Sequence, residues 1–311
     1  MISNETALVF PGQGSQKVGM GESFARHPAA KDLFAEADDI LRFNLTKLML
    51  SEDQADLSRT QNTQPALLLA GVAALRVLED ETERHAYELC HFMAGHSLGE
   101  YTALVGAGVL RFADALSLVR LRGQAMQEAV PEGEGKMAAI LGLENAQVEE
   151  IANSAGVYIA NDNAAGQVVV SGVAENIAKA CKAAKASGAK RAVELPVSAP
   201  FHCPLMAPAA DVMAQAFKKV TFNEPRVQVI SNVEARPASD AARWPDLLTQ
   251  QVTQPVRWRE SMRFLADQGV ETLAELGTGK VLAGLAKRCD ERLTATALQT
   301  VDDIKNYKEQ L

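Results

Sequence analysis

The stretch Gly95-His96-Ser97-Leu98-Gly99-Glu100 decides the fold of this 311-residue chain. An apolar run, residues 89–94, precedes it, and an Ala- and Leu-rich segment, residues 101–110, follows it. This order predicts a short buried strand that turns sharply into a helix, with Ser97 at the turn. Glycines two residues before and after the serine suit a turn in which the backbone comes too close to its neighbours for a Cβ atom. The stretch therefore predicts a nucleophile elbow, which presents a serine hydroxyl above a sheet.

Strands and helices alternate on both sides of the elbow. The alternation predicts an α/β fold with a mainly parallel sheet that is covered by helices. The expected strands are residues 6–10, 227–230, 272–276 and 294–298, and the expected helices are residues 29–50, 62–79, 112–129, 206–219, 245–252, 257–267 and 280–289.

A different order follows the linker at residues 131–135. Strands are expected at residues 136–141, 157–160, 167–171 and 190–195, with helices at 145–154 and 174–187. This βαββαβ order is the ferredoxin-like arrangement. We therefore expect a subdomain at 131–196, inserted into a catalytic core formed by 1–130 and 197–311. The polar segment 161–166 is expected to be a turn between paired strands.

Composition limits the class of protein. The hydrophobic content of 47% can fill a core, and a net charge of −8 gives no electrostatic basis for nonspecific nucleic-acid binding. The four cysteines contain no C-x-x-C pair, which favours reduced thiols over a disulfide framework or a zinc site. No run reaches 18 apolar residues and no signal-type segment opens the chain, so we expect a soluble cytoplasmic protein without a membrane partner.

A serine on an elbow needs a base, and His202 is the best candidate among the five histidines. Pro200 and Pro204 restrict the backbone on either side of it, which suits a ring that must be aimed. His96 is adjacent to the serine but is expected to point away from it across the turn. Cys203 is a rival nucleophile that has no elbow around it.

An acidic residue to orient His202 is not evident. Asp162, Glu175 and Glu194 lie between the serine and the histidine, but all three fall in the expected insertion. A backbone carbonyl could orient the ring instead, which would leave a Ser-His dyad.

Two further residues are candidates for binding an acyl substrate. Arg122 falls on the apolar face of its helix, where a cation is costly unless it is paired. Either it extends to the rim of that face or it binds an anion in a pocket. Arg120 is expected on the solvated surface. Gln13, between two glycines after the first strand, is either a backbone oxyanion donor or part of a plain turn.

Taken together, these motifs resemble the bacterial malonyl-CoA:acyl carrier protein transacylases. The resemblance covers nearly the whole chain in order. It is carried by residues 10–16, 95–101, 122–126, 163–170, 199–202 and 251–256.

The resemblance implies an α/β-hydrolase-like core with the ferredoxin-like insertion. It implies that Ser97 takes malonyl from coenzyme A as an ester and passes it to the phosphopantetheine thiol of acyl carrier protein, which supplies fatty acid elongation. His202 would be the base, held by the backbone carbonyl of Gln251. Backbone N–H groups of Gln13 and Leu98 would form the oxyanion hole.

The resemblance also assigns the substrate contacts and the partners. Arg122 would bind the malonyl carboxylate, and Gln251, Asn163 and Phe201 would complete the substrate site. Phe201 stands directly before the histidine, and in this position the chain is similar to malonyl-selective members. No metal and no cofactor are expected beyond malonyl-CoA as substrate, and the enzyme is expected to be a monomer. The alternatives are a polyketide-type acyltransferase, a serine thioesterase, and a non-catalytic scaffold that binds carrier protein.

Overall fold

A parallel sheet of five strands carries the elbow in the computed structural model, which describes residues 5–51, 53–197 and 199–311. Adjacent strands in this sheet are all parallel, and the strand order is β7-β2-β1-β8-β9. The strands are β1 (Thr6–Phe10), β2 (Phe92–Gly95), β7 (Gln228–Ile230), β8 (Thr272–Leu276) and β9 (Thr294–Leu298). Phe10 is in register with Gly95, so the segments that follow β1 and β2 leave the sheet side by side at one edge.

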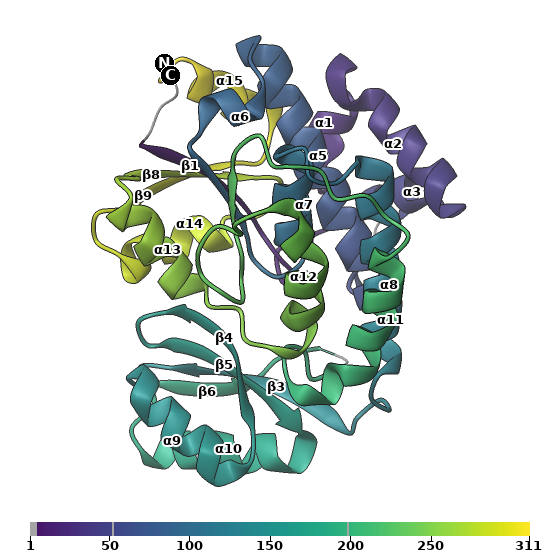
Figure 1. Ribbon diagram of the computed structural model, residues 1–311. Coiled ribbons are helices and arrows are strands. Elements are labelled where there is room, and N and C mark those ends of the chain that lie inside the picture. The colour runs from purple at the N-terminus through teal and green to yellow at the C-terminus, as the bar shows by residue number, and fades with distance from the viewer. Residues whose placement is uncertain (1–4, 52, 198) are drawn as a thin grey trace.

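Helices cover both faces of this sheet (Figure 1). Leu8 and Phe10 of β1 belong to a core shared with α5 (Thr60–Thr82) and α7 (Gly99–Gly106), and α8 (Phe112–Glu128) packs on α5. Ala7 and Val9 face the other way, into a core shared with α13 (Trp258–Asp267) and α14 (Val281–Cys289). Burial on both faces explains why the central strands β1 and β2 are mainly apolar.

The remaining helices of this part surround that frame. They are α1 (Glu22–Ala25), α2 (Pro28–Leu41), α3 (Leu45–Leu50), α4 (Gln54–Leu57), α6 (Ala86–Leu89), α11 (Ala207–Phe217), α12 (Trp244–Thr253) and α15 (Val301–Lys308), with 3-10 turns at Pro204–Met206 and Ala241–Arg243.

Two helix predictions need correction. The expected helix at 29–50 is broken, because Arg42 adopts a left-handed conformation (φ 49°) that ends α2. Asn44 then caps α3 by accepting a hydrogen bond from the N–H of Lys47. The helix α15 was not predicted, although Thr300 and Asp303 form a capping box at its start.

A second, antiparallel sheet lies below the first in Figure 1, with two helices on its outer face. Its strand order is β4-β5-β3-β6. The order along the chain is β3 (Gly135–Leu141), α9 (Asn145–Ala155), β4 (Tyr158–Ala164), β5 (Gln167–Val173), α10 (Ala174–Ala186) and β6 (Arg191–Glu194). The predicted βαββαβ succession is therefore observed. The division of the chain into a core of 1–130 and 197–311 and a subdomain of 131–196 stays a prediction.

The polar segment 161–166 is mostly strand, and the expectation of a turn there was wrong. The strand β4 continues through Asn161, Asp162 and Asn163, and the turn is confined to residues 165–166. Pairing with β5 is supplemented on the other side by Val256, whose carbonyl accepts from Asp162 N–H at 3.0 Å. Backbone partners on both sides outweigh the turn preference of these polar residues.

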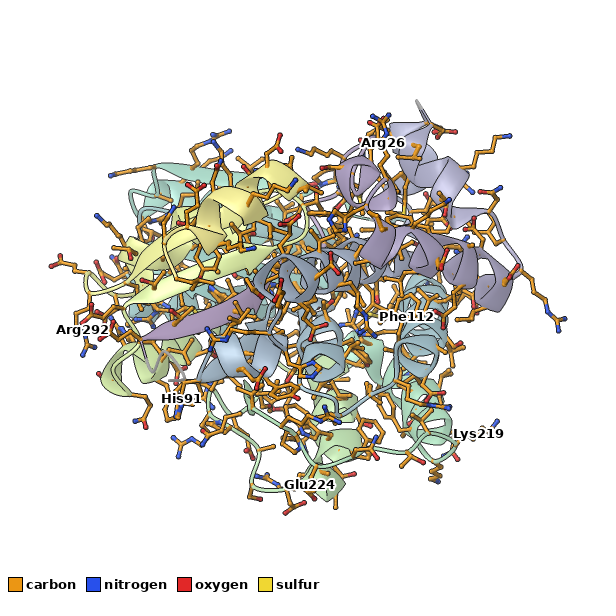
Figure 2. The ribbon with its side chains drawn as sticks, turned by 90° about the horizontal axis from the view of Figure 1, so that it is seen from above. Arg26, His91, Phe112, Lys219, Glu224 and Arg292 are labelled. Carbon is orange, nitrogen blue, oxygen red and sulfur yellow. The ribbon has the colours of Figure 1, made fainter. Side chains whose placement is uncertain are left out.

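Charged side chains lie on the outside of the molecule (Figure 2). Arg26, Lys219, Glu224 and Arg292 are exposed at well-separated points of the surface. Of the described helices, none combines the length and the apolar character that crossing a membrane requires. The four cysteines are buried and unpaired.

Candidate active site

The elbow has the strained geometry that its glycines predict. Ser97 has a φ of +52°, a left-handed conformation that side chains other than glycine rarely adopt. A Cβ atom on Gly95 would lie 1.9 Å from the carbonyl carbon of Gly99, and one on Gly99 would lie 2.1 Å from the carbonyl oxygen of Phe10. The Ser97 N–H donates to Oδ1 of Asn232 at 2.7 Å, and Asn232 Nδ2 donates to the Gly95 carbonyl at 2.7 Å. Asn232 therefore bridges the turn on both sides of the serine.

Two N–H groups beside the serine are available for an oxyanion. The loop after β1 packs against the elbow, since the N–H of His96 donates to the carbonyl of Phe10 at 3.0 Å. Gln13 from that loop and Leu98 from the elbow line one pocket with Ser97. Within the described ranges, the backbone N–H groups of Gln13 and Leu98 have no hydrogen-bond partner. Because Asn232 occupies the Ser97 N–H, these two donors remain for a tetrahedral oxyanion.

His202 meets the serine at hydrogen-bond distance. Its Nε2 lies 2.8 Å from Ser97 Oγ, and its Nδ1 lies 2.8 Å from the carbonyl oxygen of Gln251. A carbonyl oxygen can only accept, so Nδ1 carries the proton and Nε2 is free to accept the serine proton. Burial, and after it the charge of Arg122, lower the pKa of His202 to about 3. The ring is therefore a neutral base at physiological pH.

Arg122 is buried beside the nucleophile, with 1% of its surface exposed. Its Nη1 donates to Gln64 Oε1 at 2.7 Å, and its Nη2 donates to Gln251 Oε1 at 2.9 Å and to Ser97 Oγ at 3.0 Å. The sequence left two positions open for the Arg122 side chain, the rim of the helix face or a pocket. In the structure it lies in the pocket. The carboxylates of the described residues form no ion pair with it, and burial lowers its pKa. All of its hydrogen-bond acceptors are neutral oxygens.

The position of Arg122 follows from the close packing of two helices. Its neighbour Gly123 lies against α5, where a Cβ atom would be 2.7 Å from the Cα of Gln61. This approach brings Gln64 of α5 within reach of the guanidinium.

Gln251 and Glu100 lie behind the site. Gln251 is fully buried; besides its contacts to His202 and Arg122, its Nε2 donates to the Ser97 carbonyl at 2.9 Å and to Glu100 Oε2. Burial raises the pKa of Glu100 to about 8, against the opposing effect of its N–H donors and of Arg122. Gln251 does not line the pocket, so its contacts orient other residues and leave no surface for substrate.

A small pocket of about 100 Å³ lies above Ser97. Phe201 lines it as expected. Asn163 does not; it binds Nε2 of His96 at 2.8 Å, and Asn161 lines the pocket in its place. His96 also belongs to the lining, but its ring is directed to Asn163 and Trp258 and not to the Ser97 hydroxyl. The lining residues are Gln13, Gln64, His96, Ser97, Leu98, Arg122, Met126, Met137, Asn161, Leu195, Val197, Phe201 and His202.

Sequence reasoning missed the polar residues that orient the main groups. Gln64 directly precedes the apolar run that begins at Pro65, Glu100 follows the elbow directly, and Asn232 comes just after an expected strand. These positions next to predicted elements were the signals in the sequence that could have identified the three residues. Arg120 was placed wrongly on the solvated surface: it is half-buried, donates to the Gln61 carbonyl at 2.8 Å and lies over the ring of Phe43.

The fold and this arrangement are those of an acyl-transfer enzyme. Comparison with known families agrees, because residues 7–305 match the model described as "Acyl transferase domain". The chain belongs to this family and, within it, to the malonyl CoA-acyl carrier protein transacylases, as its most similar relatives show. It is therefore a transferase.

The relatives are similar over nearly their full length. The malonyl CoA-acyl carrier protein transacylase of Salmonella typhimurium is 50% identical over 297 residues, which cover 94% of this chain and 95% of that protein. A crystal structure of the acyl-carrier-protein S-malonyltransferase from Bartonella henselae matches with a TM-score of 0.94 at 45% identity and covers 98% of both chains. A malonyl-transacylase solved in complex with its type II polyketide acyl-carrier protein matches with a TM-score of 0.95 at 42% identity, covering 99% of this chain and 100% of that chain. These matches confirm the predicted fold class.

Proposed function

We propose that this enzyme transfers a malonyl group from coenzyme A to the phosphopantetheine thiol of acyl carrier protein, through an ester on Ser97. The observation that carries the proposal is the buried guanidinium of Arg122, which lies 3.0 Å from the nucleophile and has only neutral acceptors. A buried cation in this state favours a substrate that brings a carboxylate next to the reacting carbonyl. Malonyl has its carboxylate one carbon away from the thioester.

In the first half-reaction, His202 Nε2 takes the proton of Ser97 as Oγ attacks the thioester carbonyl. The N–H groups of Gln13 and Leu98 stabilise the tetrahedral oxyanion. The C–S bond then breaks, and the protonated His202 returns its proton to the thiolate of coenzyme A. The second half-reaction runs the same steps in reverse, with the carrier thiol as the nucleophile.

The overall reaction needs little driving force, because it exchanges one thioester for another. It does need a site that excludes water, which would hydrolyse the ester intermediate. Apolar side chains supply part of that exclusion: Met126, Met137, Leu195 and Phe201 line the pocket. The mechanism uses no metal and no cofactor beyond the substrate. We place the enzyme in the cytoplasm, which suits four unpaired thiols, and its monomeric state stays a prediction.

The test is intact-protein mass spectrometry after brief incubation with malonyl-CoA, followed by addition of carrier protein. We expect a malonyl adduct that moves to the carrier, and no adduct on the Ser97→Ala variant. An adduct that decays to free malonate at the same rate with and without carrier would establish a thioesterase instead. Running the second step with both a fatty-acid and a polyketide carrier tests which pathway the enzyme supplies.

A further inference from the structure

The carboxyl group of Glu100 lies in the active site but takes no part in the mechanism above. It is 1% exposed and stands three residues after the nucleophile, in the first turn of α7. Its Oε1 accepts from the backbone N–H of Asn232 at 3.1 Å, and its Oε2 accepts from Nε2 of Gln251. Both oxygens are thus used by donors that belong to residues around Ser97.

The contact to Gln251 matters because a side-chain amide can be placed in two orientations. In the observed one, Oε1 accepts from Arg122 while Nε2 donates to Glu100 and to the carbonyl of Ser97. Turning the amide over would set an NH₂ group against the guanidinium and an oxygen against two acceptors. The orientation that gives Arg122 its acceptor is therefore the one that Glu100 and the Ser97 carbonyl require.

We propose that Glu100 is a specificity-determining positioning residue, whose carboxyl group holds the Gln251 amide so that Arg122 stays aimed at the substrate carboxylate. The inference rests on the proposed function, since it deepens the account of how malonyl is selected. Glu100 acts through Gln251 and has no contact with the pocket itself. Loss of Glu100 should therefore slow transfer of acyl groups whose carboxylate binds Arg122, and it should not slow transfer of acyl groups without one.

A purely structural role makes a different prediction. Glu100 also binds Asn232, which holds the N–H of Ser97, so its loss could simply distort the elbow. Distortion of the elbow would slow transfer of every acyl group to the same extent. The ratio of malonyl to acetyl transfer separates the two roles.

Glu100→Gln is the variant of choice, because it keeps the size of the side chain. A glutamine has one oxygen and one NH₂ group, whereas both of its neighbours are N–H donors. In one of the two contacts, therefore, the NH₂ group would face another donor. Rotation of the Gln251 amide relieves that conflict and takes the acceptor away from Arg122. Glu100→Asp keeps both acceptor oxygens and is the conservative comparison.

Glu275→Gln is the matched control. Glu275 is also 1% exposed, and its two oxygens accept backbone N–H groups of Leu282 and Ala283 at 3.2 and 2.7 Å. It lies on β8 and has no contact with the pocket residues. The control variant loses a buried carboxylate of the same kind outside the active site.

The experiment measures kcat and KM for malonyl-CoA and acetyl-CoA in the three variants and the parent enzyme. We expect the malonyl-to-acetyl ratio of kcat/KM to fall by up to about tenfold in Glu100→Gln, the effect of one lost hydrogen bond, with most of the change in KM for malonyl-CoA. The ratio should stay within about threefold of the parent in Glu100→Asp and be unchanged in Glu275→Gln. Equal losses for both substrates in Glu100→Gln would overturn the proposal.

A second measurement follows the amide directly and does not depend on turnover. The side-chain NH₂ signal of Gln251 in ¹H–¹⁵N spectra, assigned by its loss in Gln251→Leu, should shift in Glu100→Gln and stay in place in Glu275→Gln. A signal unchanged in Glu100→Gln would refute the positioning role whatever the kinetics show. If the parent enzyme forms no malonyl ester, the proposed function fails, while the shift of this signal still decides whether Glu100 orients Gln251.

Discussion

Two arginines, one fully buried and one partly buried, show how the same side chain serves two purposes in this molecule. Arg259 of α13 binds Asp162 of β4 directly, with Nε 2.9 Å from Oδ1 and Nη2 2.7 Å from Oδ2. Arg122 is buried more deeply, yet its acceptors are the amide oxygens of Gln64 and Gln251 and the hydroxyl of Ser97. One guanidinium has an anionic partner among the described residues, and the other does not.

The pKa values of the two groups change in opposite directions. The hydrogen bond to Asp162 raises the pKa of Arg259, whereas burial lowers the pKa of Arg122. A direct carboxylate compensates the lost hydration of a cation, and neutral amides compensate it only in part. In this molecule, the buried cation without a direct counterion lines the pocket beside Ser97, and the partly exposed cation with a bidentate partner links α13 to β4.

Ser97→Ala should have the largest effect, because it removes the hydroxyl beside Arg122 that forms the ester in the proposed mechanism. We expect the malonyl adduct to disappear and transfer to fall by at least about 1,000-fold. Stability should change little, since the link between Arg259 and Asp162 is untouched. Mass spectrometry and a thermal melt measure both quantities. An adduct that persists in this variant would place the nucleophile elsewhere.

Arg122→Ala comes next and tests the binding side of the comparison. Loss of the partner for a buried carboxylate costs about 3–5 kcal/mol, so malonyl transfer should fall by about 100-fold to several thousand-fold. Transfer of acetyl should fall much less, which reverses or abolishes the selectivity. Steady-state kinetics with the two thioesters give the ratio. Unchanged selectivity would show that Arg122 does not bind the carboxylate.

Arg259→Ala tests the structural side and should have a moderate effect on stability alone. The pair is partly exposed, with 18% of the Arg259 side chain and 13% of the Asp162 side chain accessible. Its loss should lower the free energy of unfolding by about 1–3 kcal/mol, between the values for surface and buried pairs. The malonyl-to-acetyl ratio should not change, because backbone bonds to Val256 still hold β4. A changed ratio would mean that the link also shapes the pocket.

The smallest effect concerns the protonation of His202. Its pKa is lowered from 6.5 to about 3, first by burial and then by the charge of Arg122. Between these values the unfolded chain binds a proton that the folded protein does not, so this histidine reduces stability as the pH falls through that window. An NMR titration of the ring should show it neutral down to about pH 5. Arg122→Ala should raise its pKa and Arg259→Ala should not; equal titration curves would remove Arg122 as a cause.

The sequence by itself determined the groups whose surroundings are local. Ser97 was evident because the two glycines and the flanking strand and helix lie within a few residues of it, and His202 because prolines lie two residues away on each side. The strands at Thr6–Phe10, Thr272–Leu276 and Thr294–Leu298 have the predicted bounds. In the first two, burial in the sheet leaves a mainly apolar run. Patterns of this kind involve only residues that are close together in the chain, so they can be recognised from the sequence.

Only the tertiary structure decided how the polar groups behind the site are arranged. Gln64, Glu100, Asn232 and Gln251 come from separate helices and loops, and their orientation depends on which donor or acceptor each meets across the core. The same holds for the two arginines, which no local pattern separates into a paired and an unpaired cation. A hydrogen bond depends on distance and direction in space, and residues up to 154 positions apart in the chain supply the partners here.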